Sequence, residues 1–566
     1  MLQVFIDIVT ICARKGIKYA VLSPGSRNAL LTVAFARHPE IQCYTMTDER
    51  SAAFMALGMA QQQNHPVVLV CTSGTAGLNY SPAVAEAFYQ HIPLIIFTAD
   101  RPPEWIDQLD GQTIRQQNLY GNHVKASYTL PVDLSHQDAL WHAFRVISDA
   151  IITCTIYPKG PVHINVPFRE PFYPKADELV ELSHEVKWID VEDSHPTLSE
   201  LQWQSLLTYI EQSKHILILG GQERRDPHLI ESLSLLSTYP SVTIMGEIIS
   251  NLNSIPHVIK HMDLILYNSD NTWQKQLQPD LLIGFGQSVI SKYVKRFLRK
   301  YQAKDHWHIQ VAGDVADTFQ SLKRIIRVNP AYFFSELSKR WCHPEGHQHI
   351  KTQLWYEAEG KALPYIHRFF SNTDVFSEFL AVYLILKHLP QKSILHLANS
   401  MAVRYANWIG LDENSIEIFA NRGTSGIDGT LSTAVGHAFC TSAIVTLIIG
   451  DMSFFYDRNA LWQPSLPKNL RIIVLNNHGG GIFKMIDGSA QLPELNTYFI
   501  TSQPFSAWHT AKEATIAYDC CKDQAALYSL LPEFFLNDGR VKLLEIQTHI
   551  NQNTEVFHDV INFTSR

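Results

Sequence analysis

The chain has 566 residues, of which 46% are hydrophobic and 18% charged, and its formal net charge is −8. A single core does not grow to this size, so the length predicts about three to four domains. The acidic balance argues against a general nucleic-acid surface, and no run of about 18 apolar residues predicts a membrane span. The 8 cysteines form no CxxC pair, which argues against a zinc site or a disulfide framework and favours a cytoplasmic protein.

The first block, residues 1–183, alternates short apolar strands with segments of helical spacing. Strands are expected at 17–23, 66–72, 93–99 and 161–167. Near-continuous apolar runs of this kind are typical of a mostly parallel sheet that helices cover on both faces.

Polar residues gather where the strands of this block end. Taken singly, each has an equally good explanation as a helix cap or a turn residue. The carboxyl ends of parallel strands, however, meet at one edge of the sheet, where open α/β sheets bind ligands. We therefore expect a binding site there. The candidate residues at these strand ends or at the start of the next helix are Ser26, Arg27, Glu49, Thr72, Gly74 and Arg101.

The middle block, residues 184–345, predicts a second α/β domain. Its strands are expected at 215–221, 241–247, 280–286 and 306–313. Gly284 and Gly286 resemble part of a dinucleotide-binding loop, but the third glycine is missing and no acidic residue stands at the ribose position, so nucleotide binding is not expected. Lys292 follows the same strand, where a solvent-exposed helix lysine is the simpler explanation.

The third block, residues 365–566, predicts a third α/β domain, so the expected fold is three doubly wound, mostly parallel-sheet domains. Its strands are expected at 393–399, 415–421, 443–450, 470–475 and 541–547. Ser400 follows the first of these strands and Arg404 lies on the same helical face four residues later. Arg422 follows the second strand.

A βαβ unit over residues 443–483 carries the most informative residues of the chain. Its first strand leads into Asp451, and its second leads into Asn477 and then Gly479. A right-handed crossover brings both strand ends to the same edge of the sheet. One carboxylate and one amide oxygen then converge beside a glycine loop, and hard oxygen ligands of this kind suit Mg²⁺. Asp451 alone could equally cap the helix that follows it.

The spacing Gly-Asp…Asn-Asn resembles the diphosphate-binding motif of the thiamine-diphosphate enzymes, although Met452 stands where that family has a further glycine. The three α/β blocks, with a glutamate opening a helix in the first, match the layout of that family. Among its members, the chain is most similar to the menaquinone-pathway synthases that join 2-oxoglutarate to isochorismate. The motifs that carry this resemblance are SPGSR (23–27), DER (48–50), TSGTA (72–76), TADRPPE (98–104), HINVPFREP (163–171), NSMAVR (399–404), NRGTSGIDG (421–429) and NNHGGGIF (476–483).

The resemblance implies thiamine diphosphate as the cofactor, with Mg²⁺ or alternatively Mn²⁺ as its metal. It makes Glu49 the catalytic residue, which contacts the pyrimidine ring of the cofactor and relays protons. For the two apolar residues of the cofactor set, Ile427 and Phe483, core packing is an equally good explanation. The implied metal ligands are Asp451, Asn477 and Gly479, and the implied cofactor-binding residues are Glu49, Thr72, Gly74, Ile427, Ser453 and Phe483.

The resemblance also assigns the cationic residues to substrates that carry carboxylates, which guanidinium groups bind in bidentate fashion. Gly111 stands where the family commonly has an asparagine, so one substrate hydrogen bond is not expected here. The residues implied for the distal carboxylate of 2-oxoglutarate are Ser400, Arg404 and Arg422. Those implied for isochorismate are Ser26, Arg27, Arg101, Gln112 and Lys292.

The implied reaction removes CO₂ from 2-oxoglutarate and adds the remaining succinyl unit to isochorismate in a 1,4-addition. In this family the active sites lie between subunits, so a homodimer or homotetramer is implied. Two alternatives stay open on the sequence alone. One is another thiamine-diphosphate decarboxylase or carboligase that acts on a 2-oxo acid. The other is a catalytically silent homologue that serves as a binding protein.

Overall fold

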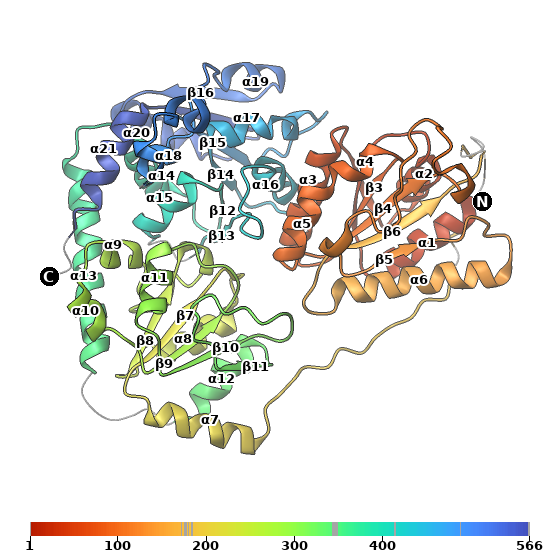
Figure 1. Cartoon of the computed structure of the whole chain (residues 1–566). Coiled ribbons are helices and arrows are strands. Elements are labelled where there is room, and N and C mark those ends of the chain that lie inside the picture. Colours follow the sequence, from red (N-terminus) through yellow and green to blue (C-terminus); the bar gives the residue numbers. More distant parts are fainter. Residues whose placement is uncertain are drawn as a thin grey trace.

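The computed structural model describes residues 2–170, 173–174, 178, 180–182, 185–341, 349–411, 415–486 and 488–563. Three α/β domains follow one another along the chain, each built around a parallel sheet with helices on its faces (Figure 1). This confirms the predicted fold class. Among the described helices, none is both long and apolar enough to cross a membrane.

The first domain has a six-stranded parallel sheet in the order β2-β1-β3-β4-β6-β5. Every residue of its central strands β3, β4 and β6 is buried, as their largely apolar sequences predict. The strands are β1 (Tyr19–Leu22), β2 (Gln42–Thr45), β3 (Val67–Cys71), β4 (Leu94–Asp100), β5 (Ser127–Thr129) and β6 (Val162–Pro167). The helices are α1 (Leu2–Arg14), α2 (Ala29–Arg37), α3 (Glu49–Gln63), α4 (Thr75–Asn79), α5 (Ser81–Tyr89) and α6 (Gln137–Thr155).

The middle domain has a five-stranded parallel sheet in the order β11-β10-β9-β7-β8. A long extended segment leads into it from the first domain (Figure 1). The strands are β7 (Ile216–Gly220), β8 (Val242–Gly246), β9 (Leu281–Phe285), β10 (Asp305–Ile309) and β11 (Arg324–Ile326). The helices are α7 (Glu200–Gln212), α8 (Pro227–Leu236), α9 (Met262–Tyr267), α10 (Asn271–Gln276), α11 (Lys292–Lys300), α12 (Pro330–Arg340) and the connecting α13 (Ile350–Asn372).

The third domain repeats the strand order of the first, with a six-stranded parallel sheet ordered β13-β12-β14-β15-β17-β16. Its strands are β12 (Ile394–Leu397), β13 (Glu417–Phe419), β14 (Val445–Gly450), β15 (Leu470–Asn476), β16 (Ala517–Cys521) and β17 (Lys542–Gln547). Its helices are α14 (Glu378–His388), α15 (Met401–Ile409), α16 (Thr430–Phe439), α17 (Asp451–Tyr456), α18 (Ile482–Met485), α19 (Trp508–Glu513), α20 (Gln524–Phe534) and α21 (Ile550–Val560).

The domain limits remain predictions. The expected boundary at residues 183 and 184 and the expected end of the middle domain at residue 345 lie outside the described residues. The expected start of the third domain, residue 365, falls inside α13, which runs without a break from Ile350 to Asn372.

The first and third domains meet through α3 and α16, which lie side by side (Figure 1). Two glycines make the close approach possible. A Cβ atom on Gly58 would lie 2.0 Å from the carbonyl oxygen of Thr433, and one on Gly436 would lie 2.0 Å from that of Met55. The backbones of the two helices therefore touch where they cross, and any side chain at either glycine would force them apart.

Candidate active site

The predicted metal ligands lie together at the carboxyl ends of two neighbouring strands. β14 and β15 pair in parallel with Gly450 opposite Leu475, so the residues that follow them meet at one edge. Asp451 is 2% exposed, and one of its oxygens accepts the Met452 N–H at 2.8 Å. The Asn477 Oδ1 atom accepts the Gly479 N–H at 3.1 Å. The arrangement gathers one carboxylate and one amide oxygen beside a glycine loop.

Two residues without a sequence signal complete this cluster. Gln503 donates to the second Asp451 oxygen at 2.7 Å, and Asn477 donates to the buried Glu378 carboxyl at 2.8 Å. Burial raises the pKa of Asp451 to about 6, and the bond from Gln503 opposes the rise. Burial, together with the Asp451 charge, raises the pKa of Glu378 to about 8.

This cluster fits a divalent cation. Two buried carboxyls this close repel each other when both are ionised, and a cation would relieve that repulsion. The available ligand atoms are the oxygens of a carboxylate and an amide, with the main chain of Gly479 beside Asp451, and oxygen ligands of this kind suit Mg²⁺. Among the described residues no group of three or more His, Cys, Asp or Glu side chains forms a metal site, so a site that depends on side-chain amide and main-chain oxygens is the one to consider.

Two arginines stand beside each other at the ends of β12 and β13. Arg422 donates through Nη1 to the Asn399 side chain at 2.8 Å, and Arg404 donates to the Ser400 carbonyl at 2.6 Å. Burial lowers the pKa of Arg422, and the positive charge of Arg404 lowers it further. Ser400 adopts a left-handed backbone with φ of 73°, which turns the chain from the strand into α15.

The middle domain adds lysines to this arginine pair. Lys292 begins α11 and lies, like Arg404, near the buried Asp263. Burial raises the pKa of Asp263, and the positive charges of Arg404 and Lys292 both lower it. Lys295 lies one turn further along α11. Burial lowers its pKa, and among the nearby charges Glu247 opposes this while Arg422 adds to it. Lys295 carries no signal in the sequence, because a helix lysine is normally a surface residue.

The first domain forms a separate cationic group. Arg27 is 5% exposed and donates to the Phe168 carbonyl at 3.2 Å. Burial lowers its pKa, and the nearby Arg101 lowers it further. Arg101 is paired with Asp110 at 2.8 Å and donates to the Gly111 carbonyl at 2.8 Å. The loop that follows β4 is therefore folded onto Arg101.

The other first-domain residues predicted for substrate line the same strand ends. Ser26 is exposed beside Arg27. Gln112 is exposed in the loop on Arg101 and has a φ of 53°. Its main chain lies against Gly74, where an added Cβ atom would come within 3.3 Å of the Gln112 carbonyl oxygen.

A buried hydrogen-bond network supports the Thr72–Gly74 turn. Gln116 accepts the Gly74 N–H at 2.8 Å and donates to the Asn165 side chain at 3.0 Å. The hydroxyls of Thr72 and Ser73 are buried without a hydrogen-bond partner among the described residues. Buried hydroxyls normally have a partner, so this turn offers two polar groups to a ligand.

Glu49 is the first residue of α3, where Asp48 caps the helix by accepting the Ser51 N–H. Its carboxylate is half-buried and accepts a hydrogen bond from the Asn79 side chain at 3.3 Å. The residues on either side of it contact the third domain. Asp48 accepts from Asn459 at 2.7 Å, and Arg50 donates to the Tyr456 carbonyl at 2.7 Å. The start of α3 is thus fixed in place while Glu49 itself stays accessible.

The three remaining cofactor candidates lie in the third domain. The Ser453 hydroxyl donates to the Ile427 carbonyl, so these two predicted residues are in contact. Ile427 is 43% exposed, which does not fit a residue of the domain's own core. Phe483 is half-buried and packs edge-on against Phe499, with ring centroids 5.5 Å apart.

The candidate residues therefore form two groups in different domains. One contains the metal cluster, the arginine pair and the middle-domain lysines, and the other contains Glu49 with the Arg27–Arg101 pair. The helices α3 and α16 join the first and third domains within one chain.

Comparisons with known proteins place this architecture. Residues 3–121 match the family model "Thiamine pyrophosphate enzyme, N-terminal TPP binding domain", and residues 181–397 match "Middle domain of thiamine pyrophosphate". A solved structure of benzoylformate decarboxylase from Polynucleobacter necessarius has the same fold. It is 15% identical, with a TM-score of 0.73, over 97% of this chain and 99% of that one. The fold and these matches define a thiamine-diphosphate enzyme.

Sequence relatives narrow the class further. The chain is 46% identical over 98% of its length, and 98% of the relative's, to a 2-succinyl-5-enolpyruvyl-6-hydroxy-3-cyclohexene-1-carboxylate synthase from Cytophaga hutchinsonii. It is 40% identical to the enzyme of the same name from Flavobacterium johnsoniae, over 97% and 96% of the two chains. The chain belongs to the 2-succinyl-5-enolpyruvyl-6-hydroxy-3-cyclohexene-1-carboxylate synthase family.

Proposed function

We propose that this protein converts 2-oxoglutarate and isochorismate into 2-succinyl-5-enolpyruvyl-6-hydroxy-3-cyclohexene-1-carboxylate and CO₂, a step of menaquinone biosynthesis. The supporting observation is the grouping of two arginines with a middle-domain lysine. Arg404 and Arg422 follow strands of the sheet that carries the Asp451 cluster, and Lys292 begins α11 of the middle domain. An enzyme whose substrates carry several carboxylates needs such a group of cations, whereas a decarboxylase of 2-oxo acids with a neutral aromatic side chain does not.

Mg²⁺ and thiamine diphosphate fit the residues that are present. Asp451, Asn477 and the Gly479 carbonyl would hold the metal, and the unpartnered Thr72 and Ser73 hydroxyls would meet polar atoms of the cofactor. When bound, thiamine diphosphate supplies the carbanion chemistry that allows a 2-oxo acid to lose CO₂. We assign to Glu49 the role of holding and moving a proton at its carboxylate, which its half-buried position at the start of a helix allows.

The cationic residues bind and orient the two substrates. Arg404 and Arg422, supported by Ser400, would hold the distal carboxylate of 2-oxoglutarate. The first-domain pair Arg27 and Arg101 would hold isochorismate together with Ser26, Gln112 and Lys292. Arg101 already forms a salt bridge with Asp110 at 2.8 Å. A substrate anion therefore has to compete with the Asp110 carboxylate for the Arg101 guanidinium.

We further propose a homodimer or homotetramer in which two copies share each site. In one chain Glu49 and the Asp451 cluster belong to different domains, and a second copy would bring them together. Some large apolar side chains are exposed in the segments that follow the strand ends, and a second copy would cover them, which supports this proposal. They are Leu78, Trp105, Leu109, Ile427, Tyr456 and Phe505. A cytoplasmic location is also proposed, and it is supported by the free thiols of the described cysteines.

The decisive experiment is mass spectrometry of the product formed from both substrates with Mg²⁺ and thiamine diphosphate. We expect the succinylated cyclohexene product and CO₂ in equal amounts, and no product when isochorismate is left out. Release of CO₂ from 2-oxoglutarate at a rate indifferent to isochorismate would instead identify a simple decarboxylase.

A further inference from the structure

Glu86 of the first domain is a buried carboxylate that reaches into the third domain. It lies on α5 and is 1% exposed. Its oxygens accept the Gly423 N–H at 2.8 Å, the Thr424 N–H at 2.6 Å and the Thr424 hydroxyl at 2.6 Å. Hydrogen bonds to an ionised acceptor are about twice as strong as neutral ones, so these three fix the loop firmly to α5.

Packing fixes the same loop. A Cβ atom on Gly423 would lie 2.7 Å from the Glu86 carbonyl oxygen and 3.1 Å from the side chains of Tyr89 and Gln90. The loop backbone is therefore pressed against the helix, and only a glycine fits at this contact. Arg422 is the residue immediately before it.

Arg422 depends on this loop for its position. Its Nη1 atom is held by the Asn399 side chain, and its Nε atom is buried without a hydrogen-bond partner among the described residues. A guanidinium with a free buried donor can bind a carboxylate without first breaking an existing bond. It does so only if the backbone beside it stays where Glu86 holds it.

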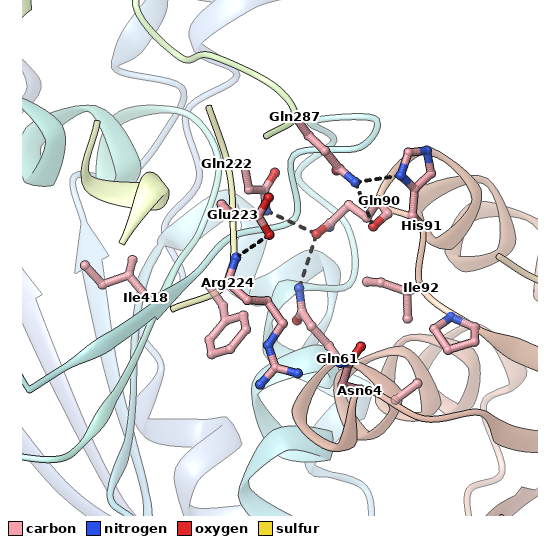
Figure 2. Close-up of a pocket in the computed structure, with 13 residues that line it drawn as sticks. Gln61, Asn64, Gln90, His91, Ile92, Gln222, Glu223, Arg224, Gln287 and Ile418 are labelled. Atoms are coloured by element: carbon pink, nitrogen blue, oxygen red, sulfur yellow. Dashed lines mark hydrogen bonds between the residues drawn. The ribbon is translucent and has the colours of Figure 1, made fainter. Parts of the chain in front are cut away.

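The middle domain holds Glu86 in turn, through the amide side chains around a cavity of about 100 Å³ (Figure 2). The Gln90 side chain donates to the Glu86 carboxylate, and its amide oxygen accepts from Gln61 at 3.2 Å and from Gln222 at 3.1 Å. Gln222 also donates to the Ala420 carbonyl at 2.9 Å, just before the Arg422 loop. The middle domain is thus linked to the Glu86 carboxylate through Gln90, while the third domain bonds to it directly.

We propose that Glu86 is a positioning residue for 2-oxo acid binding: it fixes the 422–424 loop so that Arg422 faces the distal carboxylate of 2-oxoglutarate. The inference rests on the proposed function, since it concerns the same substrate site. If Glu86 only held the domains together, its replacement would affect folding and would change the KM values for both substrates equally. A positioning residue changes the use of 2-oxoglutarate selectively.

The test is Glu86→Gln, which keeps the size of the side chain but presents an NH₂ group where the loop offers donors. We expect the KM for 2-oxoglutarate to rise by at least about tenfold, with the KM for isochorismate and the affinity for thiamine diphosphate changed by less than about twofold. Asp280→Asn is the matched control. The Asp280 carboxylate also accepts a backbone N–H, from His215 at 3.1 Å, but Asp280 lies just before β9, at the amino ends of the strands of the middle sheet. The KM values of this variant should match those of the wild type.

A double-mutant cycle with Arg422→Ala identifies the route of the effect. If Glu86 acts through Arg422, Glu86→Gln adds little once Arg422 is gone, whereas independent effects on the KM would multiply and overturn the proposal. If Glu86→Gln does not fold, Thr424→Val removes one donor to the carboxylate and should raise the same KM by about threefold; an unchanged KM in that variant overturns the proposal. Failure of the wild type to use 2-oxoglutarate would instead refute the proposed function.

Discussion

Three carboxylates of the first and third domains have roles that follow from their surroundings. Glu49 is half-buried and has one amide partner. Asp451 is buried beside a second carboxyl, so a cation is favourable there. Glu86 is buried but surrounded by donors, so its charge is satisfied by the protein itself. Glu49 is therefore suited to proton transfer and Asp451 to metal binding. Glu86, whose oxygens already accept hydrogen bonds from the protein, is suited to positioning.

Replacing Glu49 with glutamine tests the proton-transfer role. The new amide can still bond to Asn79 but cannot take up a proton, so we expect turnover to fall by about a hundredfold or more. Binding of Mg²⁺ and thiamine diphosphate and the thermal midpoint should stay close to those of the wild type. Glu40→Gln, at an exposed glutamate in the same domain, is the control. Steady-state kinetics at wild-type rates in Glu49→Gln would remove Glu49 from the mechanism.

Asp457 gives a pH-dependent prediction that concerns stability alone. It is fully buried and accepts from the Ser432 N–H at 2.7 Å and hydroxyl at 2.8 Å. Burial raises its pKa to about 7 from an ordinary value of 3.8. The unfolded chain therefore loses this proton at lower pH than the folded protein does. The proton on Asp457 stabilises the folded protein at low pH, and this stabilisation is lost as the pH rises through about 7.

In Asp457→Asn no proton is exchanged, while the amide can still accept from the Ser432 N–H and donate to its hydroxyl. We expect the variant to gain stability relative to the wild type as the pH rises, by on the order of a few kcal/mol at the plateau above about pH 7. Denaturant unfolding of both proteins between about pH 5 and 8 measures this. A difference independent of pH would show that Asp457 is ionised in the folded protein.

At the scale of elements, the helix crossing of α3 and α16 sets the relation between two domains. Gly58→Ala would place a methyl group against the Thr433 carbonyl, so we expect a loss of about 1–3 kcal/mol in unfolding free energy. Gly360→Ala is a matched control, because Gly360 lies in α13 with no atom within 4 Å of an added Cβ. That change should stabilise by up to about 1 kcal/mol. Equal effects of the two substitutions on denaturant unfolding would contradict the close crossing.

Sequence patterns predicted the central strands well, because β3, β4, β14 and β15 are largely apolar runs of the kind that a doubly covered sheet buries. Four edge strands, β2, β5, β11 and β16, were missed, whereas the edge strands β8 and β13 were predicted. β2 and β5 have 4 and 3 residues and are largely half-exposed, so they lack both the length and the apolar pattern of a strand. β16 carries two exposed residues and was missed for the same reason.

The site residues divide in the same way. Those that follow a strand end, such as Asp451 and Arg422, could be predicted because the topology brings strand ends together. Glu378, Gln503 and Glu86 could not. Glu378 contacts Asn477 from 99 residues away and Glu86 contacts Gly423 from 337 residues away, and nothing in the neighbouring sequence announces such contacts.

At the scale of the whole molecule, the proposed sharing of sites can be tested by complementation. Glu49→Gln and Asp451→Asn alter different domains, and each should be inactive alone. In a mixed dimer of the two, one site carries both changes and the other carries neither. Coexpression should therefore restore about a quarter of wild-type activity for random pairing. No recovery in a preparation that contains mixed dimers would place both residues of each site in one chain.

The matching strand orders of the first and third domains have a consequence for how the chain stays whole. The helix after β2 packs on the helix after β13, with reciprocal glycine contacts, so the two domains pair like subunits of a dimer. The covalent path between them runs through an exposed stretch in which Ile189 and Val191 are 43% and 51% exposed. A single protease cut there should leave two fragments that elute together and part only in denaturant. Polypeptide continuity is then dispensable, and the gene could be split at this point into two coexpressed halves.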